Sequence, residues 1–204
     1  MIISGADVAQ LIDVLSNNEP LMEGLRRLDG LDLPDWYLGA GCIAQTIWNV
    51  AHQKVPTESI LDYDVVYFDS DLSEHAESEI AATIAELFRD LSIRPDVKNQ
   101  ARVHLWYEAH FGYRILPYRS TEDAITTWPT TSTAIGVRPL GRQYEICAPF
   151  GTEDLLRLRV RANRVQITPE VYAAKTDRWI EAWPGLQVLP WEEGVGVEGR
   201  RRAV

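Results

Sequence analysis

The sequence has few cysteines and no long apolar run. Its two cysteines, Cys42 and Cys147, form no Cys-x-x-Cys pair, which argues against a disulfide framework or a structural zinc site and fits a reducing compartment. No apolar stretch approaches the roughly 20 residues that span a bilayer. Residues 1–7 show no basic segment ahead of an apolar core, the pattern of a secretory signal. We therefore expect a cytoplasmic protein without a membrane partner.

Positive charge is also scarce. The chain has 20 Lys and Arg against 30 Asp and Glu, a net charge of -10. Proteins that grip long nucleic acids usually have a basic face, because phosphate contacts dominate that affinity. The basic run Arg200–Arg202 is expected to be a solvated tail. The composition thus predicts no extended nucleic-acid surface, but it leaves small phosphorylated ligands open, since a metal ion and a few cations can offset a triphosphate locally.

Helical and strand patterns alternate along the chain without an internal repeat or a linker. The 204 residues suffice for one well-filled domain. We expect two short N-terminal helices within 6–27, further helices at 42–53, 74–91, 99–111, 120–128, 153–158 and 169–182, and strands at 36–40, 62–69, 93–98, 133–138 and 143–148. The predicted fold is a single α/β domain of the α+β type, with a mixed β-sheet flanked by helices. Residues 1–30 would form N-terminal helices, 31–191 a catalytic core and 192–204 a flexible tail.

Two carboxylates open the predicted strand 62–69. Asp62 and Asp64 are separated by one residue, which places both on the same face of a strand, roughly 6–7 Å apart along the backbone. The following residues are apolar on both faces, as in a central strand that is covered on both sides. Two like charges beside a buried face raise each other's pKa unless a cation neutralises them. Mg²⁺ suits this role, although such a pair on its own is more often solvated.

A glycine turn lies upstream of these aspartates. Gly39-Ala-Gly41 follows a predicted strand and precedes a predicted helix. A strand, a glycine turn and a helix N-terminus form an anion site, because backbone N–H groups and the helix dipole point toward phosphate. Asp96, on a separate short strand, is able to supply a third carboxylate. Together these features predict a joint site for metal and phosphate.

The order of these motifs resembles polymerase-β-type nucleotidyltransferases. Within that superfamily, several stretches resemble a nucleotidyltransferase-like family whose fold is similar to the head domain of CCA-adding enzymes. The resembling stretches are Trp36-Tyr-Leu-Gly-Ala-Gly, Asp62-Tyr-Asp-Val-Val-Tyr-Phe-Asp, Asp96-Val-Lys-Asn-Gln-Ala-Arg-Val-His-Leu-Trp-Tyr-Glu, Thr131-Ser-Thr-Ala-Ile-Gly-Val-Arg and Ala148-Pro-Phe-Gly. The resemblance spans roughly residues 36–191.

The resemblance implies a reaction and roles for the three acids. Asp62 and Asp64 would hold the Mg²⁺ (or Mn²⁺) that carries a nucleoside triphosphate, and Asp96 would help hold a second metal and activate the attacking hydroxyl. A hydroxyl would attack the α-phosphorus in line and pyrophosphate would leave. The glycine turn, with Gly39, Gly41 and Cys42, would sit on the β- and γ-phosphates. The acceptor stays open: a small molecule, a protein or an RNA end.

Four further polar residues are candidates for nucleotide contacts. Lys98, Asn99 and Arg102 follow the third acid directly. If Asn99 caps a helix, Arg102 lies about one turn in and could meet phosphate, or it is simply a surface arginine. Arg138 resembles a site residue of the family, and a strand-end surface arginine is the alternative. Lys175 could also approach phosphate from the C-terminal helix, although a single lysine on a helix face is usually solvated.

Departures from the superfamily pattern favour a non-catalytic alternative. Relatives often have Ser after the phosphate-loop glycine, where this chain has Ala40 or Cys42, and Cys is the weaker donor. Many relatives also carry a basic residue in the next helical turn, where this chain has Ala44 and Gln45. The alternative is a nucleotide-binding or interaction module that kept the fold and lost the activity.

A second alternative is a Rossmann-type dinucleotide-binding protein. The run from Gly39 to Ala44 matches G-x-G-x-x-A, and an acid follows about 20 residues later. In that fold, however, the ribose-binding acid follows the apolar run of the second strand. Asp62 and Asp64 precede the run and Asp69 follows it, so the order weakens this interpretation.

Overall fold

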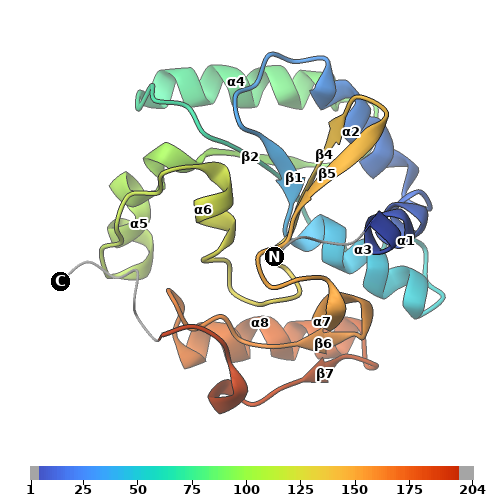
Figure 1. Ribbon diagram of the computed structural model, residues 1–204. Coiled ribbons are helices and arrows are strands. Elements are labelled where there is room, and N and C mark those ends of the chain that lie inside the picture. Colours follow the sequence, from blue (N-terminus) through green and yellow to red (C-terminus); the bar gives the residue numbers. More distant parts are fainter. Residues whose placement is uncertain (1–4, 198–204) are drawn as a thin grey trace.

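The protein forms a mixed five-stranded sheet flanked by helices, as predicted. The computed structural model describes residues 5–197 (Figure 1). The strands are β1 (Tyr37–Gly39), β2 (Tyr63–Tyr67), β3 (Pro95–Asn99), β4 (Gly136–Leu140) and β5 (Gln143–Cys147), in the spatial order β3-β2-β1-β4-β5. β2 and β3 are parallel, and the other neighbours are antiparallel. A β1 that is antiparallel to both neighbours excludes the Rossmann alternative, whose first strands are parallel.

The helices begin where capping residues predict. They are α1 (Gly5–Leu15), α2 (Glu19–Asp29), α3 (Gly41–Ala51), α4 (Glu74–Leu87), α5 (Val103–Phe111), α6 (Thr121–Ile125), α7 (Glu153–Leu156) and α8 (Pro169–Ala182), with 3₁₀ turns η1 (Gln100–Arg102) and η2 (Trp191–Glu193). The N-cap side chains of Asn18, Ser73, Ser120 and Thr168 each accept a hydrogen bond from the backbone N–H three residues later. Gly112 closes α5 in the left-handed conformation that favours glycine.

The C-terminal part contains structure that the sequence pattern did not predict. β6 (Arg159–Val160) and β7 (Gln187–Val188) form a separate parallel pair, and strands of two residues are too short to show a period. At the start of the segment expected to be a tail, Val195 N–H donates to Ala162 O at 2.8 Å. Arg200–Arg202 lies outside the described residues. No helix within 5–197 is long and apolar enough to cross a membrane.

Tryptophans attach the late helix α8 to the early helix α3. The Trp48 ring packs edge-on against Trp179 and Trp183, with 5.3 Å between ring centroids in each pair. Trp183 Nε1 also donates to Asn49 Oδ1 at 2.7 Å. The three tryptophans belong to the main hydrophobic core. A smaller apolar cluster lies around α5 and α6, on the opposite side of the sheet from α3 in Figure 1.

Candidate active site

A cleft of about 890 Å³ lies between the sheet, α3, α5 and α8. Its volume falls within the range of about 300–1,000 Å³ typical of ligand pockets. Five of the residues predicted for the site line it: Gly41, Asp62, Asp64, Asp96 and Lys98. The carboxylates predicted to hold a metal and Gly41 of the predicted phosphate turn therefore line one cavity.

Strand register places the carboxylates on one face of the sheet. Asp64 on β2 lies opposite Gly39 on β1 and opposite Asp96 on β3. Residues in register share a face, and Asp62, which directly precedes β2, also lines the cleft. The side chains of Asp62 and Asp96 are 40% and 41% exposed. Three carboxylates thus enter the cleft from two adjacent strands.

The turn between β1 and α3 is held in a strained conformation. Ala40, the N-cap of α3, has φ 56° and ψ −124°, a region that glycine normally occupies. Its N–H donates to Ile135 O at 2.9 Å, which ties the turn to the residue before β4. Gly41 begins the helix, and its N–H donates to the Asp64 carboxylate. The turn therefore aims a backbone donor into the acidic part of the cleft.

Gly39 and Cys42 are not among the residues that line the cleft. A Cβ at Gly39 would lie 2.5 Å from Ile135 O, so glycine is needed there for the close approach of β4. Cys42 is fully buried on the inner side of α3, and its Sγ donates to Gly39 O at 3.0 Å. Burial raises the pKa of this thiol. The predicted phosphate contact of the Cys42 side chain is thus corrected to a packing role.

Asp64 and Lys175 form an electrostatic pair inside the cleft. Burial, together with the charges of Asp62 and Asp96, raises the pKa of Asp64 to about 7, although Lys175 and the Gly41 N–H act in the opposite direction. Burial lowers the pKa of Lys175, with opposition from the two aspartates of β2. Lys175 lines the cleft, so the solvated interpretation of this lysine is wrong. Helical periodicity could not predict that Lys175 faces the cleft, because the contacts of α8 through its tryptophans determine how this helix is placed.

The outer two carboxylates already have cationic neighbours. Lys98 Nζ lies 2.6 Å from Asp96 Oδ1, and Arg94 Nη2 lies 3.6 Å from Asp62 Oδ2. Lys98 is two residues from Asp96 on β3, so both point to the same face, and this explains why Lys98 reaches the cleft. Of the three carboxylates, Asp64 is therefore the one whose negative charge is least neutralised by a directly contacting cation.

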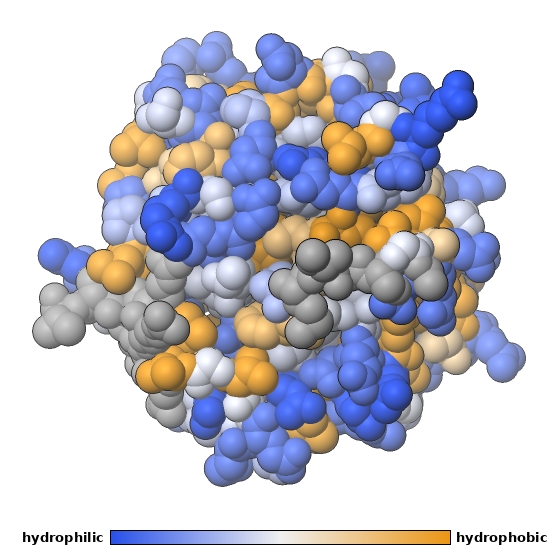
Figure 2. Space-filling view, in the orientation of Figure 1, coloured by the Kyte–Doolittle hydropathy of each residue, from blue (hydrophilic) through white to orange (hydrophobic). Residues whose placement is uncertain are grey.

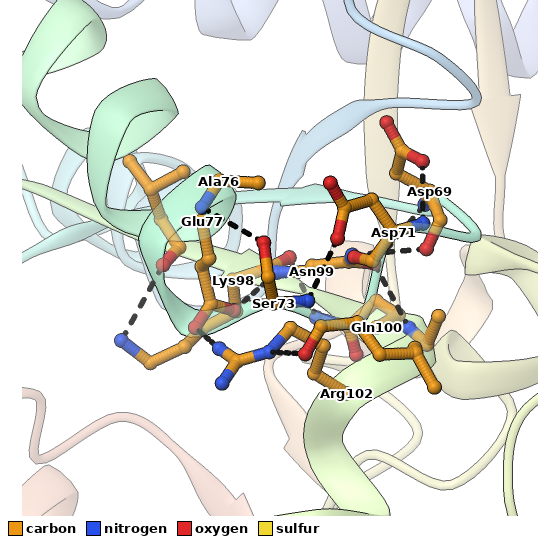
Figure 3. Close-up of polar contacts among 12 residues, drawn as sticks. Asp69, Asp71, Ser73, Ala76, Glu77, Lys98, Asn99, Gln100 and Arg102 are labelled. Carbon is orange, nitrogen blue, oxygen red and sulfur yellow. Dashed lines mark hydrogen bonds and ion pairs between the residues drawn. The ribbon is translucent and has the colours of Figure 1, made fainter.

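Asn99 lies at the end of β3 and organises the loop after β2 (Figure 3). Its Nδ2 donates to Asp69 O at 2.9 Å and to Asp71 O at 3.0 Å. Its Oδ1 accepts from Asp69 N at 3.0 Å and from Ala101 N at 3.1 Å. The second contact is the predicted cap, here of the 3₁₀ turn η1. With all four interactions made inside the protein, Asn99 positions the loop and does not line the cleft.

Arg102 is buried in the same network. Its guanidinium forms an ion pair with Glu77 of α4, and its Nε donates to Leu72 O at 2.9 Å. Glu77 also accepts from the Asn99 N–H at 2.8 Å, as Figure 3 shows. The predicted phosphate contact of Arg102 is corrected, because this side chain points toward α4 and does not line the cleft.

Arg138 likewise has other partners. Its Nη2 lies 2.7 Å from Glu145 Oε2 on β5, and its guanidinium carbon lies 4.4 Å from the centre of the Tyr37 ring. Asp35 Oδ1 is 3.6 Å away. Arg138 is not among the cleft residues, so it ties β4 to β5 and β1 instead of meeting a nucleotide.

Comparison with known proteins agrees with this geometry. A family model described as Nucleotidyltransferase matches residues 26–188. The chain belongs to this nucleotidyltransferase family. A solved protein described with the words "The NMR structure of the protein reveals a CCA-adding enzyme head domain" is 26% identical, with a TM-score of 0.71, over 89% of this chain and 95% of that one. No curated protein is significantly similar to the chain.

Family and fold identify the protein as an enzyme with a nucleotidyl-transfer role. Within residues 5–197, no three His, Cys, Asp or Glu side chains are close enough, as they stand, to hold a metal ion. The chemistry of the nucleotidyltransferase cleft nevertheless fits a hard divalent cation. Asp62 and Asp96 both raise the pKa of Asp64, so negative charge is in excess there, and carboxylate oxygens are the ligands that Mg²⁺ prefers.

Proposed function

We propose that this nucleotidyltransferase is metal-dependent and transfers a nucleoside monophosphate from a nucleoside triphosphate to a hydroxyl acceptor, with release of pyrophosphate. The observation that carries the proposal is the register of Asp64 and Asp96 beside the Gly41 N–H in one cleft. This arrangement supplies carboxylates for a cation and a helix N-terminus for phosphate within the same cavity.

Asp62, Asp64 and Asp96 would hold the metal. Bound there, Mg²⁺ or Mn²⁺ would neutralise charge on the reacting phosphate and on the leaving oxygen. Asp96 would exchange its contact with Lys98 for this role, which frees the Lys98 ammonium for a phosphate oxygen. The raised pKa of Asp64 supports the assignment, because a cation would relieve the repulsion that raises it.

The cations of α8 would bind the triphosphate. Lys175 and Arg178 line the cleft near Asp64, on the side where α3 begins. Together with the N-terminal end of α3, they offer the positive charge that the β- and γ-phosphates require. This replaces the basic residue that many relatives carry at the start of the helix, where this chain has Gln45.

The transfer itself breaks one bond and forms another. The acceptor oxygen would form a bond to the α-phosphorus as the bond between that phosphorus and the β-phosphate bridging oxygen breaks, and the electron pair would leave with pyrophosphate. The Asp96 carboxylate would take the proton of the attacking hydroxyl. The enzyme is thereby regenerated once this proton passes to water.

Thermal unfolding with Mg²⁺ and each of the four common nucleoside triphosphates tests the proposal. Metal and nucleotide together should raise the melting temperature more than either alone, and Asp64→Asn should abolish the increase. Asp177→Asn is the matched control, because this exposed carboxylate lies on α8 and does not line the cleft. If the wild type shows no metal-dependent shift with any nucleotide, the proposal fails. Binding without pyrophosphate release would instead support the non-catalytic alternative.

A further inference from the structure

The cleft has two chemically different ends, which lie along β2. Asp64 pairs with Gly39, so the N-terminal end of β2 lies beside the start of α3. Val66, two residues later, pairs with Lys98, and the chain after β3 continues through η1 into α5. Both Asp64 and Val66 line the cleft. The cavity therefore runs from the phosphate end at α3 and α8 toward an opposite end at α5.

The α5 end is built from aromatic rings. Its lining residues are Val103, Trp106, Tyr107, Phe111, Tyr113 and Tyr118. The Tyr107 ring centre lies 4.4 Å from that of Phe111, 5.4 Å from Tyr113 and 6.1 Å from Trp106. Stacked and edge-on rings of this kind form a rigid apolar surface. Trp106 packs against the apolar cluster of α5 and also forms part of the cleft wall.

The tyrosine hydroxyls of this wall already have partners within the protein. Tyr113 Oη donates to Gln166 O at 2.6 Å, and Tyr118 Oη donates to Gln166 Oε1 at 2.9 Å. The hydroxyls are therefore directed to the loop before α8, and the rings are held for contact with a ligand. Phe111 remains 47% exposed. In Figure 2 apolar residues reach the surface on the left of the molecule, where Figure 1 places α5.

Cations are unevenly distributed between the two ends. Of the described residues that line the cleft, three are cationic: Lys175 and Arg178 lie on α8, and Lys98, which pairs with Val66 and so lies nearer α5, has its ammonium on Asp96. The aromatic wall has none. In-line transfer requires the leaving pyrophosphate and the attacking hydroxyl on opposite sides of the α-phosphorus. With pyrophosphate at the cationic end, the hydroxyl must approach from the α5 end.

We infer that the aromatic wall of α5 is the acceptor subsite and that the acceptor is a small molecule with a hydroxyl on or beside a planar ring. The inference rests on the proposed function, which places the triphosphate at the other end. An RNA acceptor would bring phosphates to a wall without cations, in a protein of net charge -10. A ring matches the wall, and its hydroxyl would meet Asp96, which lines the cleft opposite Asp64 on β3, the strand that continues through η1 into α5.

Ligand-observed NMR by saturation transfer tests the subsite. The probes are 2-naphthol, tyrosinol and a short single-stranded RNA with a free 3′ hydroxyl, each added with Mg²⁺ and α,β-methylene ATP, which binds but blocks transfer. The variants are Trp106→Leu and Phe111→Ala. Leu105→Ala is the matched control, because this side chain is on α5, is 56% exposed and does not line the cleft. Affinity for the nucleotide analogue is measured in parallel.

The expected result is that a ring alcohol binds the wild type and that both wall variants weaken it about tenfold, as loss of a ring contact predicts. Leu105→Ala should bind it normally, and all variants should keep the nucleotide affinity. Loss of nucleotide affinity in the wall variants would place the base there and overturn the inference. Binding of RNA without ring alcohols, or of no probe at all, would overturn it too. The metal-dependent effect of nucleotide on wild-type melting reports separately on the proposed function.

Discussion

Asp64 and Asp96 lie opposite each other across the parallel pair β2–β3, and each contributes a carboxylate to the same cleft. Such a pairing costs stability in the metal-free protein, because like charges on a partly buried face repel. The metal-binding role proposed for these two carboxylates therefore opposes folding of the metal-free protein, and the cost in stability should be measurable.

The stability of the metal-free protein should depend on the ionisation of Asp64. Its folded-state pKa is about 7, above the usual value of 3.8, so the folded state binds the proton more tightly than the unfolded chain. The resulting stabilisation is fully present below about pH 4 and is lost as the pH rises through about 7. Asp64→Asn should therefore unfold at a higher temperature than wild type at pH 8.5 in EDTA. An equal pH dependence in both proteins, measured by urea unfolding, would contradict this.

Lys175→Met should weaken nucleotide binding by about tenfold or more, because a partly buried ammonium in the cleft would lose its contact with phosphate. Titration calorimetry with Mg²⁺ and α,β-methylene ATP measures the effect. Lys175→Arg keeps the charge and should retain more affinity, and Lys54→Met, which removes an ion pair with Glu58 at a residue that does not line the cleft, should change nothing. Equal affinity in Lys175→Met and wild type would remove Lys175 from the phosphate site.

Asn99→Ala should lower the free energy of unfolding by about 2–4 kcal/mol, since two backbone N–H groups and two carbonyls lose their partner. Urea unfolding provides the measurement. The variant should still bind nucleotide where it is folded, because Asn99 does not line the cleft. A stable variant that fails to bind would return Asn99 to the nucleotide site.

Ala40→Gly should stabilise the protein by about 1 kcal/mol. Relief of a positive φ at a non-glycine residue is worth about 1–3 kcal/mol, and the greater freedom of glycine in the unfolded chain offsets part of it. Thermal unfolding of the variant tests this. A lower melting temperature would show that the turn is not strained.

Gly39→Ala should have the opposite effect at the neighbouring position. Its Cβ would lie 2.5 Å from Ile135 O and 3.1 Å from Gly136 Cα, so β1 and β4 would have to separate. We expect a loss of several kcal/mol, as for overpacking against backbone. A stability equal to wild type in denaturant titration would show that the sheet adapts without cost.

Local sequence patterns predicted the parts of the site that depend on local structure. Alternation within 62–69 and the glycine turn at 39–41 were sufficient to bring Asp62, Asp64 and Gly41 together. The cap by Asn99 was predicted for the same reason, since a side chain and a backbone N–H two residues later decide it.

Contacts between segments that are distant in the sequence determine the side-chain positions that local patterns did not predict. Arg102 pairs with Glu77, and Arg138 contacts Glu145 and Tyr37. No spacing in the sequence predicts these partners. Lys175 reaches the cleft because Trp179 and Trp183 dock on Trp48. Because these tertiary partners fix the direction of each side chain, the sequence alone could not decide whether Arg102, Arg138 and Lys175 face solvent, substrate or the protein interior.

The docking of α8 on α3 has a consequence for how the protein is made. A ribosome synthesises Asp64 long before Lys175. Until α8 has emerged and packed on Trp48, the nascent chain carries repelling carboxylates without the cation that faces them. The nucleotide site proposed above would therefore form only after the segment through α8 has been translated.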